Sequence, residues 1–197
     1  MRDKRIVVLV EVALAIALAA VLNMLQARLP INIAGGSVSL TMLPIAVVAL
    51  RRGALPGFAS GFIFGSLDLL FEPFIVHWIQ VFMDYPFPYA FMGLGTGLFS
   101  SLYQRTAQRK NAHLLPASLT AAVAIAVGGS LRLITHIISG VVFFSEYAGG
   151  ENVWIYSIVY NASYLVPSLV GTLIVALILL PILAAAKPVW TRTTGRG

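Results

Sequence analysis

Residues 6–25 read IVVLVEVALAIALAAVLNML, an apolar run of 20 residues interrupted by one charged side chain, Glu11. An α-helix rises about 1.5 Å per residue, so a helix of this length matches the roughly 30 Å hydrocarbon core of a bilayer. We therefore predict a membrane-spanning helix over residues 6–26. The basic residues before it resemble the start of a signal peptide. The apolar run is longer than that of a typical cleaved signal, so we expect this helix to be retained.

The composition of the whole chain supports the same class. Hydrophobic residues make up 59% of the 197 residues and charged residues 10%, whereas roughly 25% of the residues in soluble domains are charged. The mean hydropathy is +0.91. These values indicate an integral membrane protein with one domain over residues 1–197. The net charge of +6 then favours contact with membrane lipid rather than with nucleic acid, and the lack of cysteine excludes disulfides and thiolate ligands.

Most of the basic residues fall into four short clusters. The clusters are Arg2/Lys4/Arg5, Arg51/Arg52, Arg105/Arg109/Lys110 and Lys187/Arg192/Arg196. Short positively charged loops tend to face the cytoplasm, so the chain should cross the membrane an even number of times between successive clusters. The predicted fold is an all-α bundle of six transmembrane helices with both termini cytoplasmic. The predicted helices cover residues 6–26, 38–50, 54–71, 75–103, 116–144 and 154–186. The fourth is expected to begin with a disturbed turn that contains Pro86 and Pro88.

Three further patterns refine this bundle. Gly57, Gly61 and Gly65 repeat every four residues and predict a smooth stripe against which another helix can approach closely. The second helix is short and contains Pro44, so we expect an interruption there and a start inside the bundle. Several acidic residues fall on or near the external side in this topology: Asp68, Glu72, Asp84, Glu146 and Glu151.

Polar side chains share one face on each of three predicted helices. The three sets are His77, Gln80 and Asp84; Arg132, His136, Ser139 and Phe143; and Asn161, Tyr164 and Ser168, with Tyr156 and Tyr160 close above. In the predicted topology all of them lie in the outer part of the membrane, where ionisable residues are costly and usually functional. An acid, an imidazole, a carboxamide and aromatic rings together suit a pocket for a small, flat, polar ligand that carries positive charge.

Each of these residues also has a structural interpretation. Asp84 could pair with Arg132 so that both charges are neutralised, and His136 could be a histidine whose hydrogen bonds are satisfied within the bundle. Asn161 could join two helices by hydrogen bonds. The tryptophans suit an aromatic belt at the membrane interface, and they are Trp78, Trp154 and Trp190.

Motifs for catalysis and for metal binding do not occur in the sequence. It contains no G-x-x-x-x-G-K-[ST], H-E-x-x-H or G-x-S-x-G, and no carboxylate pair with metal-binding spacing. We therefore predict no catalytic residue, no metal site and no cofactor. Ala13 and Ala17 form part of a flat strip on the first helix, which could admit a helix of a partner or pack internally. A binding bundle with such a strip suggests a subunit energised by its partners.

Three segments resemble the thiamine-specific substrate-binding (S) components of energy-coupling factor (ECF) vitamin importers. They are QVFMDYPF (80–87) with FMGLGTGLF (91–99), RLITHIISG (132–140) with FFSEY (143–147), and WIYSIVYNASY (154–164). The similarity covers nearly the whole chain. It implies a six-helix membrane bundle that binds thiamine near the outer surface. It also implies a transmembrane coupling subunit and two cytoplasmic ATPase subunits as partners. The ATPase subunits hydrolyse the ATP.

The resemblance also assigns residues and a location. The residues implied as ligand contacts are Asp84, Tyr85, His136, Tyr156, Asn161 and Phe144. Asp84 stands where some members carry glutamate, and Phe144 stands where some carry a stacking tryptophan. Ala13 and Ala17 are implied as part of the docking surface. The protein is then not an enzyme, and its expected location is the plasma membrane of a prokaryote.

Three other interpretations remain open from the sequence. The same machinery could bind another vitamin or a precursor such as hydroxymethylpyrimidine. The chain could instead be a proton-coupled carrier in which Asp84, His136 and Arg132 form a relay. A structural or assembly subunit would bind no small molecule at all.

Overall fold

The three longest apolar stretches of the sequence form the three longest helices. These are α1 (Arg2–Gln26), α7 (Leu114–Phe143) and α8 (Val153–Ala185). Each contains a stretch that is long and apolar enough to cross a membrane. At each helix end that the structure describes, the observed bound differs from the predicted bound by at most four residues.

The structure is a computed structural model that describes residues 2–26, 32–33, 36–71, 73–107 and 114–185. Some residues named in the sequence analysis lie outside these ranges: Glu72, Arg109, Lys110, Lys187, Trp190, Arg192 and Arg196.

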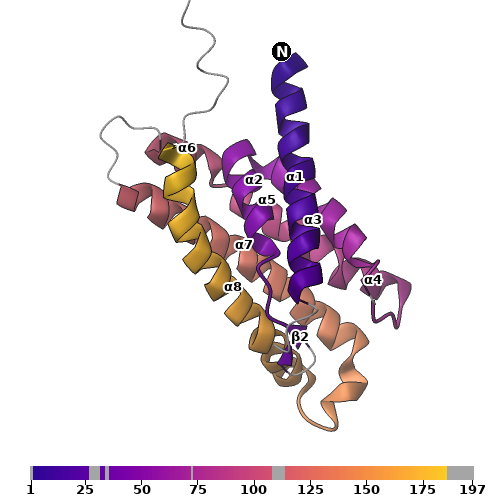
Figure 1. Ribbon diagram of the computed structural model, residues 1–197. Helices are drawn as coiled ribbons and strands as arrows, with labels where there is room; N and C mark the ends of the chain where they lie inside the picture. The colour runs from indigo at the N-terminus through magenta and orange to yellow at the C-terminus, as the bar shows by residue number, and fades with distance from the viewer. Residues whose placement is uncertain (1, 27–31, 34–35, 72, 108–113, 186–197) are drawn as a thin grey trace, which may run out of the picture.

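Shorter elements fill the space between the long helices. They are β1 (Asn32–Ile33), β2 (Gly36–Ser37), α2 (Met42–Arg52), α3 (Ala54–Asp68), α4 (Trp78–Asp84), α5 (Pro86–Gly97), α6 (Ser100–Ala107) and the 3-10 helix η1 (Ser145–Ala148). The prediction of an all-α chain therefore holds apart from the two-residue antiparallel strand pair. Figure 1 shows α4 and β2 at one end of the bundle, and α6 with the start of α1 at the other.

The single helix predicted over residues 75–103 is divided into three helices, α4, α5 and α6, and the first break adjoins the disturbed turn predicted at Pro86 and Pro88. The first break lies at Tyr85, whose φ of −114° and ψ of −79° depart from helical values. Pro86 follows as the first residue of α5, where its missing N–H does not interrupt the hydrogen-bond ladder. The second break follows Gly97. The chain therefore turns within the bundle next to Asp84.

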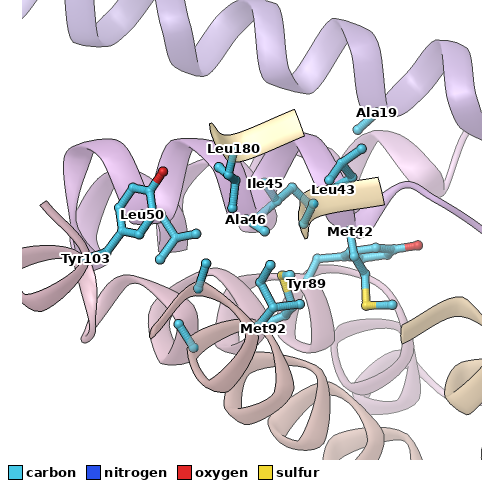
Figure 2. Packing of buried hydrophobic residues seen from close by; sticks show 14 of the residues in the cluster. Ala19, Met42, Leu43, Ile45, Ala46, Leu50, Tyr89, Met92, Tyr103 and Leu180 are labelled. Atoms are coloured by element: carbon cyan, nitrogen blue, oxygen red, sulfur yellow. The ribbon is translucent and has the colours of Figure 1, made fainter. Parts of the chain in front are cut away.

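The short helix α2 occupies the centre of the hydrophobic core. Eight of its eleven residues are buried, and Figure 2 shows several of them packed among side chains of other elements, including Tyr89, Met92 and Leu180. A helix that is apolar on all sides needs such an enclosure. Thr41 and Met42 are almost fully buried, so α2 starts inside the bundle, as predicted. Pro44 is the third residue of α2, in the first turn, where a backbone N–H would have no acceptor within the helix, so it does not interrupt the helix.

Helices α3 and α5 pack with their backbones in contact, as the glycine stripe predicts. A Cβ on Gly57 would lie 2.5 Å from the carbonyl oxygen of Gly93, and a Cβ on Gly61 would meet the backbone of Tyr89. A Cβ on Gly65 would meet the backbone of Tyr85 and Pro86. The glycines of α3 therefore determine how close α5 comes, and they hold the break at Tyr85 against α3.

Two polar contacts attach α1 to the bundle. Arg52, at the end of α2, donates from Nε and Nη2 to the two carboxylate oxygens of Glu11, each at 2.6 Å. Near the other end of α1, the Asn23 amide donates to Asp68 at 2.7 Å. Paired, charge-assisted bonds of this geometry are among the stronger side-chain contacts. They determine which face of α1 is turned toward α2 and α3.

The contact between α3 and α5 gives a direct test of the fold. Gly61→Ala should lower the free energy of unfolding by about 1–3 kcal/mol, because the methyl group meets backbone atoms that cannot rotate away. Gly171→Ala on α8 is the matched control, since its Cβ would lie 3.4 Å from the nearest atom, the end of the flexible Leu40 side chain. Thermal unfolding in detergent should therefore show a lower Tm for Gly61→Ala only. Equal Tm values for the two variants would contradict the close contact.

Candidate functional site

The break between α4 and α5 places Asp84, the last residue of α4, among polar side chains from other helices. Gln80 lies one turn earlier on the same face of α4, and its Nε2 donates to Asp84 Oδ2 at 2.6 Å. On α7, Nδ1 of His136 lies 3.6 Å from Asp84 Oδ1. The exposed fraction is 17% for the Asp84 side chain and 10% for that of His136. The acid and the imidazole predicted from the sequence are therefore brought together.

Asn161 of α8 joins this group through its carboxamide. Its Nδ2 donates to the carbonyl oxygen of His136 at 3.4 Å and to that of Ser157 at 2.9 Å. Its Oδ1 accepts a hydrogen bond of 2.9 Å from the hydroxyl of Tyr164. Asn161 therefore joins α8 to α7 by a hydrogen bond, as its structural interpretation requires. The orientation of its carboxamide is fixed by Tyr164 and Ser157.

Aromatic rings line α8 beside these polar groups. Tyr156 stacks on Tyr160 with 6.0 Å between ring centroids, and Tyr160 meets Tyr164 edge-on at 5.9 Å. The Tyr164 ring in turn lies edge-on to the His136 imidazole at 6.4 Å. A row of tyrosines therefore runs from Tyr156 to the polar group that contains Asp84.

Two predicted ligand contacts, Tyr85 and Phe144, instead contact the segment between α3 and α4. The hydroxyl of Tyr85 accepts a hydrogen bond from the Phe74 N–H at 2.8 Å. The ring of Phe74 stacks on Phe144 with centroids 6.1 Å apart, and Phe144 also contacts the ring of Tyr147. Both residues therefore lie beside the group around Asp84, connected to it through Phe74.

Several buried polar atoms of α7 and α5 have no hydrogen-bond partner within the described part of the chain. They are Nε and Nη1 of Arg132, Nε2 of His136 and Oγ of Ser139, all on one face of α7, and Oγ1 of Thr96 on α5. A buried polar group without a partner is costly, typically by about 1–3 kcal/mol. His136 is thus not a satisfied histidine of the bundle. The face of α7 that was predicted from the sequence keeps hydrogen-bonding capacity that the described residues do not use.

Arg132 does not pair with Asp84. It forms no ion pair with a carboxylate of the described residues, and its guanidinium carbon lies 4.0 Å from the centre of the Tyr89 ring. Its exposed fraction is 6%. Cation–π contact with Tyr89 offsets part of the cost of burying this charge, and the Asp84 carboxylate stays free of a permanent cation.

Sequence reasoning did not assign three residues that complete the group: Gln80, Tyr164 and Ser157. Gln80 and Tyr164 share helix faces with predicted contacts but had no assigned role. Ser157 lies one turn before Asn161, and this spacing could have identified it. Its Oγ donates to the carbonyl oxygen of Ile137 at 2.8 Å and so links α8 to α7. Among the described residues, no group of three or more His, Asp and Glu side chains could hold a metal ion.

The alanine strip on α1 divides between two faces. Ala13 and Ala17 are exposed, whereas Ala15 and Ala19 are buried against the bundle. Internal packing therefore uses Ala15 and Ala19. Ala13 and Ala17 lie on a face that is open to lipid or to another protein.

A mostly helical bundle with membrane-spanning helices and a buried polar group at one end is typical of a membrane transport protein. A model of the thiamine transporter protein family matches residues 9–188 of this chain, and the chain belongs to that family. The match confirms the resemblance given by the sequence segments. The family consists of transporters and not of enzymes, as expected for a chain without catalytic motifs.

Individual relatives agree with this assignment. The thiamine transporter ThiT of Bacillus subtilis is 36% identical over 180 residues, which cover 90% of this chain and 92% of that protein. The thiamine transporter ThiT of Lacticaseibacillus paracasei is 31% identical and covers 92% of this chain and 90% of its own length. The solved structure of ThiT from Listeria monocytogenes superposes with a TM-score of 0.76 at 31% identity, over 92% of this chain and 94% of that one.

The unpaired charge of Arg132 leads to a stability prediction. Arg132→Met should leave the Tm of the ligand-free protein unchanged or raise it, because apolar replacement of buried charges is often neutral or stabilising by about 1–4 kcal/mol. Arg52→Met is the contrasting variant, since it removes the bidentate partner of Glu11 and should lower the Tm. A lower Tm for Arg132→Met in thermal unfolding would indicate that its charge is compensated in the bundle.

Proposed function

We propose that this protein is the membrane-embedded thiamine-binding subunit of an ATP-driven importer of the ECF type. It binds thiamine from the external side and catalyses no reaction itself. A transmembrane coupling subunit and two cytoplasmic ATPase subunits supply the energy. The residues that we assign to the ligand are Asp84, Tyr85, His136, Phe144, Tyr156 and Asn161.

The observation that carries this proposal is the convergence of Asp84, His136 and Asn161 from three separate segments. Family membership indicates the ligand, and the chemistry of the group agrees with it. Thiamine carries a cationic thiazolium ring, which a carboxylate and aromatic faces can stabilise. Its aminopyrimidine ring both donates and accepts hydrogen bonds, so it can satisfy the unpartnered Nε2 of His136 and use the second lone pair of the Asn161 carbonyl oxygen. Because Arg132 does not neutralise Asp84, the carboxylate is available to a cation.

The distribution of basic residues supports the external position of the site. Arg51 and Arg52 end α2, and Arg105 lies in α6, at the end of the bundle opposite to α4 (Figure 1). Short basic segments face the cytoplasm, so α4 and Asp84 belong to the external side. The six segments that contain α1, α2, α3, α4–α6, α7 and α8 then cross the plasma membrane of a prokaryote, with both termini in the cytoplasm.

The exposed face of α1 supports docking of a partner. Ala13 and Ala17 lie one above the other on this face, and small side chains let a second helix approach closely within a membrane. We assign this face to the coupling subunit.

Titration of the purified, vitamin-free protein with thiamine tests the ligand. Saturable binding followed by tryptophan fluorescence, with hydroxymethylpyrimidine as competitor, identifies the part of the ligand that is recognised. Absence of binding would refute the proposal. Uptake that persists without the ATPase subunits and collapses with the proton gradient would favour a proton-coupled carrier.

The role of Asp84 gives the first functional prediction. Asp84→Asn should weaken thiamine binding by roughly 30-fold or more, because removal of one partner of a buried charge pair costs about 2–5 kcal/mol. Isothermal titration of the variant measures this change. Glu146→Gln, which changes an exposed carboxylate, is the matched control and should bind as the parent does. Hydroxymethylpyrimidine lacks the thiazolium charge, so Asp84→Asn should affect its affinity little. Unchanged thiamine affinity would remove Asp84 from the ligand contacts.

The exposed face of α1 with Ala13 and Ala17 gives the second functional prediction. In the double variant Ala13→Trp/Ala17→Trp, the added rings should hold a partner helix away and abolish both ATP-dependent uptake and co-purification of the coupling subunit. Thiamine affinity of the isolated protein should stay at the parent value, because the site lies at the other end of the bundle. The control is Ile174→Trp/Ile178→Trp on the exposed face of α8, which should transport normally. Full uptake by the α1 variant would place docking on another surface.

A further inference from the structure

Gln80 is the most buried polar side chain of α4, with an exposed fraction of 1%. The proposed function assigns it no role, although its carboxamide is fully engaged. Nε2 donates both to Asp84 Oδ2 at 2.6 Å and to the carbonyl oxygen of Phe74 at 3.1 Å. Oε1 accepts the N–H of Val76 at 3.2 Å. One side chain therefore contacts both the carboxylate of the site and the segment before α4.

Apart from Gln80, that segment, residues 73–77, is held through Phe74 and through His77, whose imidazole stacks on the Phe143 ring with centroids 5.3 Å apart. Phe74 and Val76 are largely exposed. Besides Gln80, the backbone of Phe74 is held by the hydroxyl of Tyr85, and its ring stacks on Phe144. Phe74 thus contacts three residues of the site. They are Gln80, which binds Asp84, and the proposed ligand contacts Tyr85 and Phe144. These contacts connect the ligand site to the segment.

The hydrogen bond from Gln80 also restricts the Asp84 carboxylate. With Oδ2 held by Gln80, the other oxygen, Oδ1, is directed toward His136. A carboxylate without this bond could rotate and turn its charge away from a ligand beside His136. Side chains whose rotamers are fixed by neighbouring hydrogen bonds give more precise sites.

We propose that Gln80 is a positioning residue: its carboxamide orients the Asp84 carboxylate and couples it to residues 73–77, so that ligand binding at Asp84 increases the order of this segment. The inference rests on the proposed function for the identity of the ligand. Because Gln80 acts through Asp84 and does not touch the ligand, its loss should matter only while the carboxylate is present.

A double-mutant cycle separates this role from a merely structural one. Gln80→Met keeps the length of the side chain and removes its hydrogen bonds, and it should weaken thiamine binding by about 10- to 100-fold, since a hydrogen bond to a charged group is lost. In the Asp84→Asn background the same change should weaken binding by less than about threefold. Equal losses in both backgrounds would overturn the positioning role. Gln104→Met is the matched control, because Gln104 also donates to backbone carbonyls, of Leu50 and Arg51, but at the other end of the bundle.

Hydrogen exchange tests the coupling. In the parent the amides of Phe74 and Val76 should exchange more slowly when thiamine is bound, and in Gln80→Met this difference should disappear. If Gln80→Met does not fold, Gln80→Asn serves in its place. It keeps a carboxamide but shortens the side chain by one methylene, so that the amide cannot reach Asp84 Oδ2 and the Phe74 carbonyl together, and it should also weaken binding. Parent-like affinity and exchange in either folded variant would overturn the proposal. A parent that binds no thiamine would refute the proposed function alone, because faster exchange of Val76 in ligand-free Gln80→Met still tests whether Gln80 holds the segment.

Discussion

The direct backbone contact between α3 and α5 determines where the polar group can form. Gly57, Gly61 and Gly65 leave no space for side chains between the two helices, and the last of them holds the chain at Tyr85 and Pro86. The start of α5 is therefore fixed in position. Asp84 immediately precedes Tyr85. The packing of Gly65 against Tyr85 and Pro86 therefore also fixes the position of Asp84. A polar group on an internal break needs such support, because a break in a helix leaves backbone groups without partners.

The residues that the structure describes satisfy the polar group only in part. Asp84 and Asn161 have hydrogen-bond partners, whereas the free atoms of Arg132, His136 and Ser139 lie together on α7. In a low-dielectric interior, unused donors and acceptors are expensive, and they strengthen any interaction that satisfies them. The division suits a binding protein: one side of the group is fixed in advance by the fold, and the other keeps its hydrogen-bonding capacity for a ligand.

Much of this could be predicted from the sequence, and the remainder depends on tertiary contacts. The apolar runs predicted the long helices, and the four-residue spacing of Gly57, Gly61 and Gly65 predicted close packing. Helical periodicity placed Asp84, His136 and Asn161 on faces that do converge. A disturbed turn at Pro86 and Pro88 was predicted, but the separation of α4 from α5 at Tyr85 was not, because a proline can kink a helix without ending it. The pairing of Arg132 with Tyr89 and not with Asp84 could not be predicted, because it depends on the distance between α5 and α7.

The bidentate contact between Glu11 and Arg52 also bears on biosynthesis. The two residues are 41 positions apart, so α1 emerges from the ribosome long before the guanidinium that pairs with its carboxylate. Glu11, the single carboxylate within the apolar run of residues 6–25, still allows insertion, but α1 then has no fixed rotation about its own axis. The pairing of Glu11 with Arg52 of α2 fixes the rotation of α1 and turns Ala15 and Ala19 toward the bundle. The orientation of the first helix in the bilayer is therefore decided by the second, and the exposed face of α1 is established only once the core has assembled.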